Sequence, residues 1–129
     1  MKSLLKKQFF QQPFRSRQEC YEFLVGQLGE DESTQFLHLL EERERLASVE
    51  IFPGVVMPHL ESNRLKESQI IILQLQDSIQ WLNTTRDVRL MILLAMKKDE
   101  EVEIKRQLIA FVHQLADEEF IQALLENQT

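Results

Sequence analysis

Two long, almost purely apolar segments do most to limit the folds open to this chain. Residues 68–75 read SQIIILQL, and residues 87–96 read DVRLMILLAM. Continuous apolar runs of this length are typical of central strands that are buried on both faces, although a short helix remains open for the second run. A sheet that is buried on both faces needs helices packed against both sides.

Four segments are predicted to supply those helices. A capping box at residues 16–19 starts a helix over residues 17–28, and a second helix follows to residue 46. Because only a few residues join these two helices, we expect them to pack antiparallel. Residues 102–116 carry apolar side chains at helical spacing, and a last helix follows over residues 117–125.

Shorter strands complete the predicted order of elements. Residues 4–10 are a candidate first strand, and residues 48–52 and 55–57 flank a Pro-Gly turn. Residues 76–86 are mostly polar and are interpreted as a long connection, in which Trp81 either covers an edge of the core or marks a partner surface. The order β-α-α-β-β-β-β-α-α predicts an α/β (α+β) fold with a mixed sheet between helices.

The bulk composition narrows the functional classes. At 129 residues the chain has the size of a single domain, residues 1–129, and its net charge of −6 argues against direct binding of nucleic acid. No apolar run is long enough to span a bilayer, and the N-terminal segment lacks the apolar core of a signal peptide. We therefore expect a cytoplasmic protein with no membrane partner. The single cysteine, Cys20, excludes an intrachain disulfide and a thiolate metal site, and we expect no cofactor.

Three histidines are the candidate reactive groups. His59 ends a short apolar strand, follows Pro58 and precedes a polar stretch, and reactive groups are often placed in loops after strands. His38 and His113 lie on predicted helices and are interpreted as solvated or packing residues. No second histidine lies at metal-ligand spacing from His59, so no metal site is predicted. The charged residues 41–45 would, taken alone, be a solvated helix end with internal ion pairs.

One combination of residues resembles a known family. Arg43 and Glu44 end a helix, the step from Arg43 to His59 is sixteen residues, and the histidine closes the sequence Val-Val-Met-Pro-His. This pattern resembles the mannitol/fructose-type enzyme IIA domains of the bacterial sugar phosphotransferase system (PTS), and the layout is similar over about residues 4–125. The resemblance implies a three-layer α/β/α sandwich with a mixed sheet. It also implies phosphorylation of His59 by the phosphocarrier protein HPr, onward transfer to an enzyme IIB domain, and an active-site arginine at Arg43.

The chemistry of these residue types agrees with that role. A neutral imidazole nitrogen is a competent nucleophile towards phosphorus near neutral pH. The guanidinium of Arg43 can grip two phosphoryl oxygens and stabilise the charge that they carry in the transition state. Pro58 limits backbone freedom and so helps to fix the imidazole. We expect an apolar rim, formed by Val56, Leu60 and Trp81, to give a docking surface a dry centre.

The chain also differs from the family pattern at several positions. Leu60 stands where most members have Gly, Val49 stands where they have Thr, and Ile104 is the best match to a second active-site histidine. In this respect the chain is similar to the IIA-like domains that end some transcription regulators and antiterminators, which often carry an Ile-x-Trp sequence like that at residues 79–81. Three functions stay open: a phosphoryl carrier in sugar uptake, a sensor in which phospho-His59 changes contacts with regulator domains, and a scaffold that is not phosphorylated.

Overall fold

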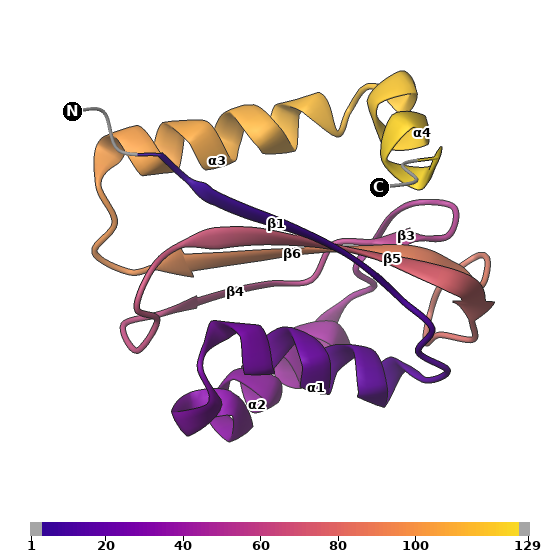
Figure 1. Cartoon of the computed structure of the whole chain (residues 1–129), viewed down its shortest axis with the longest axis horizontal. Coiled ribbons are helices and arrows are strands. Elements are labelled where there is room, and N and C mark those ends of the chain that lie inside the picture. Colours follow the sequence, from indigo (N-terminus) through magenta and orange to yellow (C-terminus); the bar gives the residue numbers. More distant parts are fainter. Residues whose placement is uncertain (1–3, 127–129) are drawn as a thin grey trace.

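The computed structural model describes residues 4–126, which form three layers (Figure 1). A mixed six-stranded β-sheet lies in the middle. The helices α1 (Arg17–Leu28) and α2 (Ser33–Leu46) cover one face, and α3 (Val102–Gln114) and α4 (Glu118–Glu126) cover the other. The predicted α/β/α sandwich with a mixed sheet is confirmed. No helix within the described residues is long and apolar enough to cross a membrane.

The sheet combines parallel and antiparallel pairs. Its strands are β1 (Lys6–Gln12), β2 (Glu50–Phe52), β3 (Val55–Val56), β4 (His59–Ser62), β5 (Gln69–Ile79) and β6 (Val88–Lys97). They lie in the order β1-β5-β6-β3-β2, and β4 also pairs with β6. β1 runs parallel to β5, and both β3 and β4 run parallel to β6. The pairs β5–β6 and β2–β3 are antiparallel.

The two apolar segments form the centre of this sheet, so the strand interpretation of both is confirmed. Ile71 lies opposite Leu93, and Ile72 lies opposite Ile92. The first pair belongs to the core under α1 and α2, whereas the second pair belongs to the core under α3 and α4. Successive side chains of a strand point to opposite faces, so two central strands supply both cores.

β5 is longer than the sequence predicts. Residues 76–79 extend the strand to Ile79, which lies opposite Val88 beyond an irregularity in the register. The predicted connection over residues 76–86 is therefore wrong over its first four residues. The side chains of residues 76–78 are exposed and polar, so they carry no apolar signal for a strand.

The strand that begins at His59 is not predicted either. β4 pairs in parallel with β6, with His59 opposite Leu94 and Ser62 opposite Lys97. Its side chains alternate between exposed and buried, and Leu60 is its only apolar residue. His59 therefore starts a strand instead of ending one, and the polar stretch after it is paired with the sheet.

Local capping signals set the helix ends. The Ser16 hydroxyl accepts a hydrogen bond of 3.1 Å from the backbone N–H of Glu19, as the capping box predicts. Gly29 follows α1 with a φ of 143°, a backbone conformation that favours glycine. Ahead of α4, the Asp117 carboxylate accepts a hydrogen bond of 2.9 Å from the N–H of Glu119.

Candidate functional site

His59 lies where one edge of β6 changes partners. β3 pairs with the first part of β6 and β4 with its last part, so these two strands follow each other along the same edge. Pro58 stands at the break between them, where its carbonyl accepts a hydrogen bond of 3.1 Å from the N–H of Leu94. Pro58 is buried, whereas the side chain of His59 is exposed. The imidazole therefore reaches solvent from a backbone that is fixed on both sides of Cα.

The surroundings of His59 favour its neutral form. Partial burial lowers the pKa of the imidazole below its ordinary value, and the positive charge of Arg43 lowers this pKa further. Both effects act against the charged form, burial by removing water and Arg43 by repulsion. The ring nitrogen that carries no proton keeps its lone pair, which a nucleophile needs.

Arg43 lies in the last turn of α2, a helix that contacts β4. Its side chain is half-buried, and the carboxylates nearest to it in sequence are engaged elsewhere: Glu42 pairs with Arg45, and Glu44 with Arg17. Within residues 4–126 the Arg43 guanidinium forms no hydrogen bond or ion pair with a carboxylate. A partly desolvated guanidinium whose charge acts on a largely neutral imidazole offers donors and charge to an anion.

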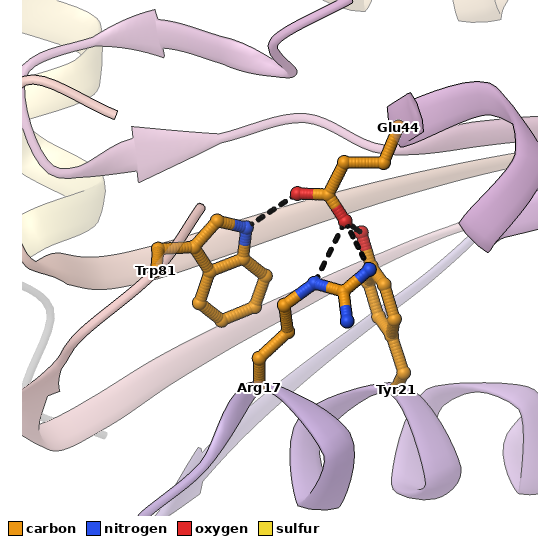
Figure 2. A network of polar contacts seen from close by, with 4 residues as sticks. All are labelled: Arg17, Tyr21, Glu44 and Trp81. Atoms are coloured by element: carbon orange, nitrogen blue, oxygen red, sulfur yellow. Dashed lines mark hydrogen bonds and ion pairs between the residues drawn. The ribbon is translucent and has the colours of Figure 1, made fainter. Parts of the chain in front are cut away.

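Glu44 is the centre of a buried polar group, the Glu44 cluster, which comprises Arg17, Tyr21, Glu44 and Trp81 (Figure 2). Its side chain is only 2% exposed. Oε1 accepts hydrogen bonds from Arg17 Nε at 2.9 Å and from the Tyr21 hydroxyl at 2.7 Å. Oε2 accepts one of 2.7 Å from Trp81 Nε1. The interpretation of residues 41–45 as a solvated helix end is therefore wrong for Glu44.

The residues expected to form an apolar rim lie in the core instead. Val56, Leu60 and Trp81 are at most 8% exposed and belong to the core under α1 and α2. Leu60 follows the exposed His59 in a strand, so their side chains point to opposite faces. Of the two interpretations of Trp81, the core position is correct, and the indole N–H of Trp81 donates a hydrogen bond to Glu44.

A second carboxylate fastens the turn ahead of β3 to the connection after β5. Glu50 accepts hydrogen bonds from the backbone N–H of Thr85 at 2.9 Å, from its hydroxyl at 3.0 Å, and from the N–H of Gly54 at 3.3 Å. Burial opposes ionisation of Glu50, but these hydrogen bonds outweigh it and lower the pKa of the carboxyl. The Ser48 hydroxyl also donates to the Asn83 carbonyl at 2.8 Å. Sequence patterns gave no signal for this long-range clamp.

The other singled-out residues have the ordinary roles expected of them. The side chain of His38 is 70% exposed, and that of His113 is exposed on α3. Cys20 is fully buried, and burial raises the pKa of its thiol to about 12. In the part of the chain that the structure describes, no group of three or more His, Cys, Asp or Glu side chains is arranged to hold a metal ion.

The three positions that differ from the family pattern are all buried. Val49 and Leu60 are each 5% exposed, and Ile104 is 7% exposed. The carbonyl of Val49 accepts a hydrogen bond of 2.8 Å from the N–H of Met57, so the backbone around β2 and β3 is held without a threonine hydroxyl. Ile104 packs in the core under α3 and α4. These side chains contribute packing and no polar group.

Comparison with known proteins identifies relatives over almost the whole chain. Residues 3–129 match the family described as "Phosphoenolpyruvate-dependent sugar phosphotransferase system, EIIA 2". Multiphosphoryl transfer protein 1 of Escherichia coli (strain K12) is 28% identical over 128 residues, which are 96% of this chain and 15% of that protein. The PTS system 2-O-alpha-mannosyl-D-glycerate-specific EIIABC component of the same strain is 32% identical over 123 residues, which are 90% of this chain and 18% of that protein. The chain thus spans less than a fifth of the length of these curated relatives.

Solved structures share the fold. The complex of enzyme IIAMTL and phosphorylated enzyme IIBMTL from Escherichia coli contains a chain that superposes with a TM-score of 0.71. The superposition covers 95% of this chain and 87% of that chain, at 18% sequence identity. At 18% sequence identity, this similarity shows that the two chains share a fold.

Proposed function

This chain belongs to the EIIA 2 family of the phosphoenolpyruvate-dependent sugar phosphotransferase system, and on that premise we propose that His59 accepts a phosphoryl group from the phosphocarrier protein HPr. The group then passes to an enzyme IIB domain, in the cytoplasm. The observation that carries the proposal is the pairing of an exposed imidazole, biased to its neutral form, with a guanidinium that has no carboxylate partner within residues 4–126.

The proposed step is an in-line displacement at phosphorus. The unprotonated ring nitrogen of His59 attacks, a nitrogen–phosphorus bond forms, and the bond that joined phosphorus to the donor breaks, with its electron pair left on the donor. The step needs no oxidant and no reductant. The transition state spreads negative charge over three equatorial oxygens, so catalysis depends on position and on nearby positive charge.

Arg43 is proposed to supply that positive charge. Its guanidinium presents several N–H donors in a fixed plane and can hold two phosphoryl oxygens together. The same charge that lowers the pKa of His59 before reaction would stabilise the dianionic phosphoryl group after it. Arg43 thus favours both the nucleophile and the product.

Onward transfer to an enzyme IIB domain is supported by the names of one relative and one solved structure. One curated relative is named as an EIIABC component, and a solved structure of the same fold is a complex of an enzyme IIA with a phosphorylated enzyme IIB. These names support the proposal that this chain passes the phosphoryl group on to an enzyme IIB domain.

Phosphorylation by purified phospho-HPr tests the proposal. Wild type should gain one phosphoryl group, which mass spectrometry detects under alkaline conditions that preserve phosphohistidine. His59→Ala should gain none, and Arg43→Ala should gain it about 10²- to 10³-fold more slowly, as for loss of one transition-state donor. His38→Ala and Arg106→Ala are matched controls on exposed side chains and should react like wild type.

The result also separates the alternative functions. Transfer from phospho-His59 to a IIB domain supports a carrier in sugar uptake. Stable phosphorylation without transfer to any IIB domain supplied would indicate a sensor for regulator domains. If wild type stays unmodified beside an active donor, the domain is a scaffold and the proposal is wrong.

A further inference from the structure

The Glu44 cluster joins three separate parts of the chain at one carboxylate. Arg17 and Tyr21 come from α1, Glu44 comes from the last turn of α2, and Trp81 comes from the connection after β5 (Figure 2). The rings of Tyr21 and Trp81 also meet edge to face with centroids 5.8 Å apart. The Arg17 guanidinium lies 4.8 Å from the centroid of the Tyr21 ring. The C-terminal end of α2 is therefore held from two directions.

Burial makes these contacts necessary for Glu44. A carboxylate removed from water is costly unless donors satisfy its oxygens, and here both oxygens are satisfied. Within residues 4–126 no buried side-chain nitrogen or oxygen lacks a hydrogen-bond partner. Rotation of the last turn of α2 would break several of these bonds at once and leave a buried charge. The cluster thus resists such a rotation.

Arg43 shares that last turn. Neighbouring residues on a helix point in directions about 100° apart, so Glu44 can enter the cluster while Arg43 points elsewhere. The charge of Arg43 acts on His59, on the strand that α2 contacts. Because Arg17 occupies the Glu44 carboxylate at 2.7 Å, that carboxylate is not available to pair with Arg43.

We propose that the Glu44 cluster is a positioning device for Arg43: it fixes the last turn of α2 and engages the neighbouring carboxylate, and so holds the guanidinium beside His59. Its importance for catalysis rests on the proposed function, whereas the geometric claim does not need phosphorylation. Arg17, Tyr21, Glu44 and Trp81 are positioning residues, because they would not touch the reacting atoms.

An NMR titration of His59 in the unphosphorylated protein tests the geometric claim. Trp81→Phe and Tyr21→Phe each remove one donor to Glu44 while they keep an aromatic ring and the net charge. Each should raise the pKa of His59, because a guanidinium that is held less firmly repels the imidazolium less. Arg43→Gln should raise this pKa at least as much, and its effect is the largest rise that the cluster could cause through Arg43. In the Arg43→Gln background, Trp81→Phe should add nothing, because the cluster acts through Arg43.

Two further variants separate positioning from simpler effects. Ile121→Val removes a buried methyl group from the core under α3 and α4, and should lower stability without moving the His59 titration. Glu44→Gln removes a negative charge, so a purely direct effect would lower the pKa of His59. Positioning predicts a rise instead.

Each outcome decides the inference. If Trp81→Phe and Tyr21→Phe lower the melting temperature but leave the His59 titration unchanged, the cluster is structural only and the inference is wrong. A rise that persists in the Arg43→Gln background, or an Arg43→Gln variant that titrates like wild type, overturns it as well.

Phosphorylation kinetics then report on the proposed function separately. Trp81→Phe should accept the phosphoryl group roughly tenfold more slowly at saturating phospho-HPr, with an unchanged dependence on HPr concentration, because misplacement of a catalytic group slows the chemical step. If wild type is not phosphorylated while the titrations shift as expected, the proposed function fails and the positioning role stands.

Discussion

At the scale of single residues, His59 differs from the other two histidines in how its backbone is held. His38 and His113 project from helices into solvent. His59 begins a strand, and the residue before it is a buried proline whose carbonyl is hydrogen-bonded to β6. A transferable group needs a fixed point of attachment, since small displacements are costly in phosphoryl transfer.

The lowered pKa of His59 predicts the pH range in which it can react. Its imidazole should titrate below the 6.5 of an ordinary histidine, so the ring stays neutral at a lower pH than an ordinary histidine does. An NMR titration beside a short Met-Pro-His-Leu peptide checks this. A midpoint at or above that of the peptide would contradict it.

The same shift has a consequence for stability. The unfolded chain binds a proton at His59 more readily than the folded chain does, so the stability of the fold decreases as pH falls through 6.5 towards the lower folded value. His59→Gln should therefore show a shallower loss of melting temperature between about pH 7 and pH 5 than wild type.

At the scale of elements, α1 begins at a cap that the sequence already reveals. Ser16→Ala removes the acceptor of the Glu19 N–H and should lower the free energy of unfolding by about 1 kcal/mol. Urea denaturation checks the value. Ser16→Asp keeps an acceptor at the same place and should restore most of the loss, and equal stability of Ser16→Ala and wild type would show that the cap contributes nothing.

Elements with a regular or continuous pattern of apolar residues could be predicted from the sequence. Elements that are defined by backbone pairing with a distant strand could not. The runs at residues 68–75 and 87–96 carry their own signal, because burial on both faces demands apolar residues. β4 has one apolar residue in four, and its identity as a strand comes from β6, more than thirty residues later. The end of β5 likewise depends on β6, because Ile79 pairs with Val88 beyond the irregularity in the register.

The candidate site shows a similar division. Arg43 and His59 were predicted through the family resemblance that the Arg-Glu and Pro-His pattern carries, whereas the hydrogen-bond partners of Glu44 were not predicted. Helical spacing aligns Glu44 with Phe36 and Leu40, which indicates an inward direction. It says nothing of the partners, because Arg17, Tyr21 and Trp81 meet only after α1, α2 and the sheet have packed.

At the scale of the whole molecule, two cores share the same two central strands. Ile92→Ala, in the core under α3 and α4, should lower the free energy of unfolding by about 2–5 kcal/mol. Fluorescence of Trp81, in the opposite core, should report the same shifted urea midpoint as circular dichroism, because the sheet couples both layers into one transition.

A surface change on the same layer provides the control. Ile109 is 52% exposed on α3, and Ile109→Ala should change the free energy of unfolding by no more than about 0.5 kcal/mol. Separate midpoints for Trp81 fluorescence and circular dichroism in Ile92→Ala would show that the two layers unfold independently.

The succession of β3 and β4 along β6 also has a consequence for folding during translation. His59 is translated before β6, the strand that aligns it and ends at Lys97, and before Trp81, whose indole donates to Glu44. A nascent chain that stops before β6 carries the histidine but not the edge that fixes it. Under the proposed function, a chain can accept a phosphoryl group only after its central strand β6 has been translated and has folded. Phosphorylation would therefore report that the sheet has formed.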